Sequence, residues 1–209
     1  MLKFIFILTL FTFGKHFCWA QKIIQKEFSA ESISSLVILD DNIFKIEIKS
    51  SKNSEIILNV HISGEHSESV VIEEKIAQEK LTIHTGFAPF FNLENDKLSA
   101  HKIMAIEVEL IIPEHISVEI KSKLATVEAE GKLINLAIFL ENGNCALRNF
   151  LGNAHLETVV GNITVHAQNN VSGTAFSKFG TVENTLPKKG RFFIEAESNY
   201  GNISLLQTE

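Results

Sequence analysis

The densest group of metal-ligating side chains in the sequence lies between residues 61 and 68, where His61, Glu65, His66 and Glu68 are close together. A zinc ion needs three or four ligands that converge on one point. On a β-strand, His61 and Glu65 would share one face while His66 would point to the other, and Gly64 interrupts the strand. We therefore interpret this group as a solvated turn and predict no metal site.

Catalytic groups are equally scarce. The sequence has no Gly-x-Ser-x-Gly nucleophile motif. Cys145 holds the position in its local motif that isoleucine holds at 163 and 203, which indicates a small buried hydrophobe and not a nucleophile. The carboxylate pairs Asp40-Asp41 and Glu73-Glu74 are adjacent in sequence, so on a strand their side chains would point to opposite faces. We predict no enzymatic activity and no cofactor.

One segment is a candidate binding surface. Three phenylalanines, Phe87, Phe90 and Phe91, lie with Leu93 in a loop that begins at Gly86, between two expected strands. If these rings are exposed, they form an apolar patch of the kind that marks a partner contact. The alternative is that the loop folds back and caps one end of the structure.

The first twenty residues predict a secretory signal peptide. Lys3 precedes an apolar run of ten residues from Phe4 to Phe13, about half the length that spans a bilayer. Cys18-Trp19-Ala20 then places small residues at the −3 and −1 positions of a cleavage site. Because Phe17 stands where a lipoprotein signal requires a small residue, we expect cleavage after Ala20 and no lipid anchor. We expect residues 21–209 to form one domain.

Composition limits the partners. The chain carries 19 basic and 25 acidic residues, and Lys188-Lys189 is its only basic pair in the expected mature part. Nucleic acids and anionic membranes both require concentrated positive charge, so neither is an expected partner. No segment after residue 20 is apolar enough to span a membrane. Cys145 is then the only cysteine, so the domain must be stable without an internal disulfide.

The positioning elements are expected to be β-strands. In Ile43 to Lys49, a period of two places Phe44, Ile46 and Ile48 on one face and charged residues on the other. Similar alternation recurs along the N-terminal part, residues 21–112, with turn-forming residues between the runs. The segment from Glu73 to Lys80 is compatible with a short helix, and equally with a strand followed by a turn.

From residue 113 to 207 the sequence repeats itself. A glycine-polar-apolar-polar-apolar pattern starts at Gly143, Gly161 and Gly201, with a shorter copy at Gly180 and a degenerate one at Ala125. In chain order the copies are 18, 18, 19 and 21 residues apart. Two short strands and two tight turns take about 20 residues, which predicts a two-strand-per-coil β-solenoid. A β-sandwich with coincidental turns is the alternative. If coils stack in chain order, one inward column contains Val127, Cys145, Ile163, Val182 and Ile203 in that sequence.

These features together resemble a known family. Alternating strands lead to Val108-Glu109-Leu110-Ile111-Ile112-Pro113, then Val118-Glu119-Ile120, then successive Gly-Asn-Ile-type turns. This order is similar to the bacterial putative-adhesin family of unknown function, related to the head GIN domain of putative autotransporter adhesins. The resemblance covers roughly residues 36 to 207 and implies an exported or surface β-solenoid-like protein without enzymatic activity. The chain departs from the pattern at Ala125, which lacks the glycine, and at Asn184, which lacks the expected apolar side chain.

Three functions are compatible with these observations. The first is an exported, non-enzymatic cell-envelope module, in the periplasm, on the outer surface or outside the cell, that acts by surface recognition or as a structural element. The second is a periplasmic carrier of a lipid or other apolar ligand, with Phe87, Phe90 and Phe91 at the mouth of its cavity. The third is a carbohydrate-active enzyme, although Arg148 and Arg191 alone are too few for an anionic sugar chain.

Overall fold

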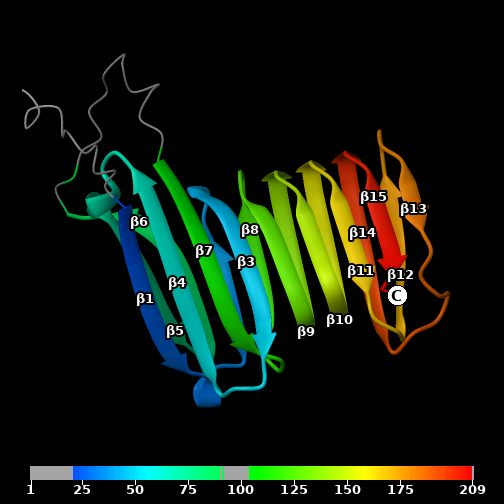
Figure 1. Cartoon of the computed structure of the whole chain (residues 1–209), viewed down its shortest axis with the longest axis horizontal. Helices are drawn as coiled ribbons and strands as arrows, with labels where there is room; N and C mark the ends of the chain where they lie inside the picture. The colour runs from blue at the N-terminus through cyan, green and yellow to red at the C-terminus, as the bar shows by residue number, and fades with distance from the viewer. Residues whose placement is uncertain (1–20, 90, 92–103, 209) are drawn as a thin grey trace, which may run out of the picture.

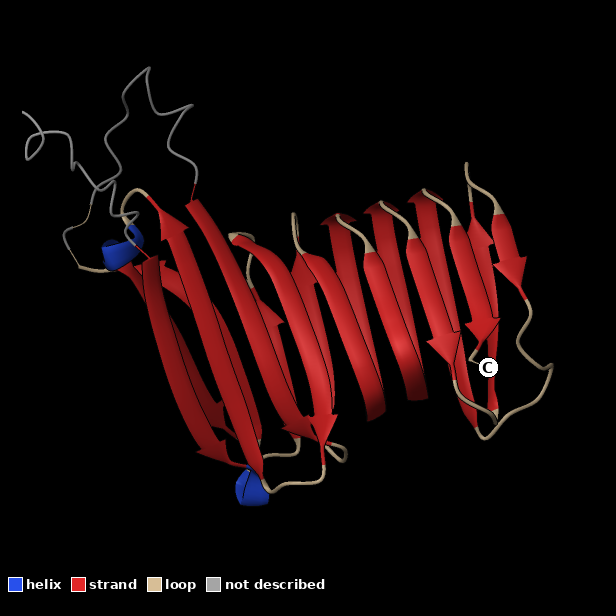
Figure 2. Cartoon of the chain, in the orientation of Figure 1, coloured by secondary structure: helices blue, strands red, loops and turns tan. Residues whose placement is uncertain are grey.

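The computed structural model describes residues 21–89, 91 and 104–208, so the expected signal peptide and Phe90 lie outside the described residues. The described chain is all-β, as predicted. In this described part, fifteen strands form one open sheet that is arranged as two facing layers (Figures 1 and 2). The only helical elements among these residues are two 3-10 turns, η1 (Ala30–Ser32) and η2 (Ser67–Ser69).

Layer one is the longer of the two series of neighbouring strands. In spatial order it contains β1 (Gln21–Ser29), β4 (Glu55–Gly64), β7 (Met104–Pro113), β3 (Ile43–Ser51), the first parts of β9 (Thr126–Asn142) and β10 (Cys145–Val160), β11 (Ile163–Ala167), β15 (Ile203–Gln207) and β13 (Val182–Asn184). From β7 to β13 every neighbouring pair is parallel, whereas β1 and β4 are antiparallel additions at one end.

Layer two faces it and is built in the same way. Its order is β5 (Val70–Ala77), β6 (Lys80–Phe87), β2 (Ser35–Leu39), β8 (Ser117–Ser122), the second parts of β9 and β10, β14 (Phe192–Tyr200) and β12 (Val171–Ser177). Only the β5–β6 pair is antiparallel here. The turn between β5 and β6 has positive φ at Gln78 (52°) and Glu79 (60°), as in two-residue hairpins. The segment from Glu73 to Lys80 is therefore strand and turn, and not a helix.

Two long strands join the layers. Residues 126–130 of β9 pair with β3 in layer one, and residues 136–140 pair with β8 in layer two. The bend between these parts contains Gly131, whose φ is 97° and whose missing Cβ would lie 2.2 Å from Ser50 Oγ. A side chain at this position would meet both steric and backbone strain. Inward-facing residues of both layers form one continuous apolar core.

The alternation predicted for Ile43 to Lys49 is wrong for Phe44, the first residue that it places on the inward face. Ile46 and Ile48 are buried as expected, but Phe44 is 58% exposed and Ile43 is buried in its place. The register between β3 and β7 shifts between Ile43 and Lys45. A β-bulge adds one residue to a strand and so reverses the facing of the residues beyond it, which accounts for the outward ring.

The predicted inward column is also wrong in its order. Ile163 pairs with Cys145 on one side, as expected, but with Ile203 and not Val182 on the other. Val182 pairs only with Ile203 and is 45% exposed, because β13 is the last strand of layer one. The pair β14–β15 thus lies between β10–β11 and β12–β13, although it follows both in sequence (Figure 1).

The incomplete repeat copy explains this order. Ile203 and Leu205 fill the two inward positions of β15 and are buried. The corresponding positions of β13 are Val182 and Asn184, and a polar residue in an interior column costs free energy unless it is hydrogen-bonded. At the end of the stack, the Asn184 side-chain amide donates to the Gly173 carbonyl of β12 at 2.9 Å. The copy with a polar inward residue therefore lies at the end of the stack.

Candidate recognition surface

Asparagine side chains hold the turns of the repeat copies together. These turns follow β9, β10, β14 and β12 and form one edge of the stack, which we call the turn ridge. The backbone N–H of Asn162 donates to Asn144 Oδ1 at 2.8 Å, and that of Asn202 donates to Asn162 Oδ1 at 2.8 Å. Thr181 N–H continues the ladder to Asn202 Oδ1 at 2.9 Å. The Gly-Asn motif is therefore a device that aligns each turn with its spatial neighbour.

The glycines of the same turns allow the backbones to approach closely. A Cβ on Gly161 would lie 1.9 Å from the Gly143 carbonyl oxygen, and one on Gly201 would lie 1.8 Å from that of Gly161. Hydroxyl groups donate to carbonyls of the turn glycines: Ser198 Oγ lies 3.1 Å from Gly161 O, and Ser177 Oγ lies 2.7 Å from Gly201 O. These contacts make the ridge a rigid support for outward side chains.

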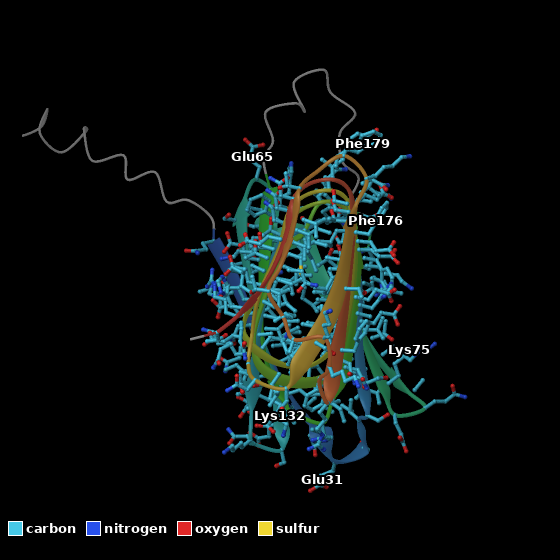
Figure 3. The ribbon with its side chains drawn as sticks, turned by 90° about the vertical axis from the view of Figure 1, so that its right-hand side faces the viewer. Glu31, Glu65, Lys75, Lys132, Phe176 and Phe179 are labelled. Atoms are coloured by element: carbon cyan, nitrogen blue, oxygen red, sulfur yellow. The ribbon has the colours of Figure 1, made fainter. Side chains whose placement is uncertain are left out.

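Apolar side chains are exposed along this ridge. Val160, Tyr200 and Phe179 each precede a turn glycine, and the side chains of all three are exposed. The rings of Phe179 and Tyr200 stack with centroids 4.8 Å apart and planes at 14°. Lys178 Nζ lies 5.3 Å from the Phe179 centroid, a cation–π distance. Phe179 points away from the stack at the top of the view in Figure 3.

A shallow groove of about 540 Å³ runs beside the ridge on the outer surface of layer two. We call it the layer-two groove. Its apolar lining consists of Leu39, Phe139, Leu140, Val159 and Phe176, contributed by strands β2, β9, β10 and β12. The remaining lining is polar: Asp40, Asp41, Lys121, Ser122, Lys123, Glu141, Glu157, Thr158, Glu197, Ser198 and Asn199.

The charged groups around the groove are ordered by ion pairs within and between strands. Lys121 pairs with Glu119 of the same strand, β8, at 2.6 Å, and its Nζ also lies 5.2 Å from the Phe139 ring centroid of β9. His155 bridges two carboxylates, with Nε2 2.7 Å from Glu157 and Nδ1 3.0 Å from Glu195. Burial lowers the pKa of His155, but the hydrogen bonds to Glu157 and Glu195 outweigh burial, so the net pKa is raised.

This arrangement suits binding. Exposed aromatic faces, carboxylates and ammonium groups can contact a ligand through apolar, cation–π and hydrogen-bonding interactions.

Among the residues that the structure describes, no group of three or more His, Cys, Asp or Glu side chains is placed to hold a metal ion. Asp40 and Asp41 have structural roles: Asp40 accepts from the backbone N–H of Asn42 at 2.7 Å and of Thr85, and Asp41 pairs with Lys123.

The described residues of the predicted aromatic loop, 86–89 and 91, lie at the opposite end of the molecule from β12 and β13, and Leu93, like Phe90, lies outside the described residues (Figure 1). Phe87 ends β6, is partly buried and packs against the core. Its ring stacks on Phe91 at 5.3 Å, and Phe91 lies 5.1 Å from the ring of His66. These contacts bring Phe87 and Phe91 together.

Sequence reasoning missed the groove and the ridge aromatics. Phe139 and Phe176 occupy outward positions, each directly after an inward residue of a repeat strand. The sequence did contain a sign of the groove, because each of these two aromatic residues stands at an outward position, where the period of two predicts a polar residue. Cys145 is buried as predicted, and burial raises the pKa of its thiol to about 12.

Comparison with known proteins identifies the fold. Neither the family models nor the curated proteins contain a match to this sequence. A solved structure of a putative cell adhesion protein from Clostridium sporogenes matches with a TM-score of 0.64 at 16% identity, covering 90% of this chain and all of the other. A putative adhesin from Bacteroides fragilis matches with a TM-score of 0.46 at 11% identity, over 88% of this chain and 97% of the other.

No helix in the described part of the chain is both long and apolar enough to cross a bilayer. The match to the clostridial structure rests on the arrangement of strands, since so few residues are identical. The chain therefore has the fold of this putative cell adhesion protein, in agreement with the resemblance seen in the sequence.

Proposed function

We propose that this chain is an exported, non-enzymatic module of the cell envelope that recognises a partner through the layer-two groove and the adjoining turn ridge. The observation that carries the proposal is the set of outward rings of Phe139, Phe176, Phe179 and Tyr200 on backbone held by the asparagine ladder. Exposed apolar side chains on a rigid scaffold mark interaction sites in soluble proteins.

The organisation of the chain supports this proposal. We infer that the parallel stack is a β-solenoid with two strands per coil, because the β9–β10 and β10–β11 registers are each offset by 18 residues. Export rests on the signal-like composition of residues 1–20. The name of the clostridial fold neighbour agrees with a role in recognition.

The carrier hypothesis lacks comparable support. Inward side chains of the described residues pack into one cluster, and the layer-two groove is an open depression and not an enclosed chamber. A bound lipid would need an apolar cavity that covers most of its surface. The aromatic group of Phe87, Phe90 and Phe91 stays in the proposal as a second contact.

Photo-cross-linking in the native host tests the proposal. Benzoylphenylalanine would replace Phe139 in the groove, Phe87 at the other end, or Phe44 as a matched control, since Phe44 is an exposed ring of layer one. We expect a discrete adduct from position 139 and none from position 44. An adduct from position 87 alone would move the site to the aromatic loop, and equal labelling at all three positions would contradict a specific surface.

A further inference from the structure

Among the strands that the structure describes, four are edge strands of the two layers, and one of the four differs chemically from the others. β1 contains Lys22, Lys26 and Glu27, and β5 contains Glu73, Glu74 and Lys75. Charged side chains on an edge strand oppose the addition of another strand. β13 has only three residues and includes Glu183. β12, with the sequence VSGTAFS, is an edge strand of seven residues without a single charge.

The backbone of β12 has an open side. Phe192 N–H donates to Asn170 O at 3.1 Å and Lys178 N–H donates to Ser198 O at 3.0 Å, so the even-numbered residues are directed at β14. Successive residues of a parallel strand point their backbone groups to opposite sides, so residues 173, 175 and 177 face the open edge. Val171 and Ser172 are buried, whereas Thr174 and Phe176 are exposed. The accessible edge therefore runs from Gly173 to Ser177.

We propose that two copies of the chain associate by antiparallel pairing of β12 about a two-fold axis at Ala175. In this register Gly173 is opposite Ser177 of the partner subunit, and about six backbone hydrogen bonds can form. The Asn184 amide that now occupies the Gly173 carbonyl would be released. On the outer surface Phe176, which is 62% exposed, would lie beside Thr174 of the partner subunit.

The geometry favours a second copy in this orientation over a head-to-tail fibre. At the other end of the stack, Lys22 Nζ donates to the carbonyls of Glu68 and Val70 at 3.0 and 2.9 Å, and Lys26 pairs with Glu74 at 2.5 Å. Pairing β12 with that end would bury these charges. Pairing it with itself brings together two uncharged strands, and a two-fold contact is closed.

The contact is small. Five residues at about 3.3 Å each and two layers about 10 Å apart, with their outer side chains, give roughly 350 Å² per copy. That is below the ~1,200 Å² total of stable complexes, so the dimer should form reversibly at high concentration. Because Phe176 also lines the layer-two groove, pairing would join two grooves edge to edge and let one dimer bind a repetitive partner at two points. The association does not depend on the groove having a ligand.

Sedimentation equilibrium on purified residues 21–209 tests the inference, over protein concentrations from about 10 μM to about 1 mM. We expect a monomer–dimer equilibrium in the wild type. Thr174→Lys places a charge on the exposed edge and should raise the dimer dissociation constant at least about tenfold. Ala175→Pro removes an N–H that faces the open side, which an edge strand tolerates, and should have the same effect.

Thr164→Lys is the matched control, because Thr164 faces outward from β11 in the middle of layer one. It should leave the dissociation constant within about twofold, and all three variants should keep a wild-type melting temperature. A wild type that is monomeric throughout the concentration range would overturn the inference. So would a dimer that neither Thr174→Lys nor Ala175→Pro weakens.

Discussion

Replacing Gly201 with alanine should destabilise the protein severely, although the change adds a single methyl group. The new Cβ would lie 1.8 Å from the Gly161 carbonyl oxygen, which is backbone and cannot rotate away. To relieve this overlap, the two turns must move apart by more than about 1.5 Å, since ordinary contacts begin near 3.4 Å. That movement would break the hydrogen bond from Gly161 N–H to Tyr200 O (3.0 Å) and the one from Asn202 N–H to Asn162 Oδ1 (2.8 Å).

Two lost hydrogen bonds at about 1 kcal/mol each, together with overpacking of about 1–3 kcal/mol, give a loss of ~3–5 kcal/mol. The melting temperature, followed by far-ultraviolet circular dichroism, should fall by roughly 10 °C. Gly86→Ala is the control, because the atom that its Cβ would meet is the end of the flexible Glu73 side chain, at 2.7 Å. It should cost less than about 1 kcal/mol. Equal melting temperatures for the two variants would refute the close stacking of the turns.

Three further outcomes follow from the packing and charges. Ile203→Ala should lower the free energy of urea unfolding by ~2–5 kcal/mol, because Ile203 is 1% exposed and lies between Ile163 and Val182. Val182→Ala, at the end of the stack, should lower it by ~1 kcal/mol or less, and the reverse ranking would contradict the strand order. Burial raises the pKa of the Cys145 thiol to about 12, so Cys145 should react with a thiol reagent only when urea unfolds the protein. Rapid labelling of the folded protein would argue against burial. Cys145→Val should lower the free energy of unfolding by less than ~1.5 kcal/mol. The pKa of His155 is raised in the folded state, so its stabilising effect should be complete below its unfolded pKa of about 6.5 and lost as pH rises through the folded pKa. The free energy of unfolding of the wild type should therefore exceed that of His155→Gln by up to ~1 kcal/mol near pH 5.5. A larger difference near pH 8.5 would be inconsistent with the pairing of His155 with Glu157 and Glu195.

The strand class and the turn positions could be predicted because they depend on local pattern. Alternation of apolar and polar residues predicts strands wherever one face is buried, and glycine followed by asparagine marks turns that stack closely. The burial of Cys145 followed from its place in that pattern. These features hold for any order in which the copies are stacked.

The order itself could not be read from the spacing, because the same spacing is compatible with any order in which the copies are stacked. It depends on which copy tolerates exposure, and Asn184 was the local sign that β13 does. The bulge that turns Phe44 outward is likewise a pairing property of β3 and β7. The groove combines residues from β2, β8, β9, β10, β14 and β12, so its composition depends on this long-range arrangement.

The insertion of β14–β15 between earlier strands is the basis of the proposed surface, since it places Glu197 and Ser198 in the groove and Phe176 at its far side. Paired cysteines in a Cys145→Val background test it most directly. Thr164 and Ser204 are register partners on adjacent strands, so Thr164→Cys with Ser204→Cys should form a disulfide under mild oxidation. Thr164 and Glu183 are separated by β15, about 10 Å apart, so Thr164→Cys with Glu183→Cys should stay reduced. A disulfide in the second pair and none in the first would show that the strands stack in chain order and would contradict the account.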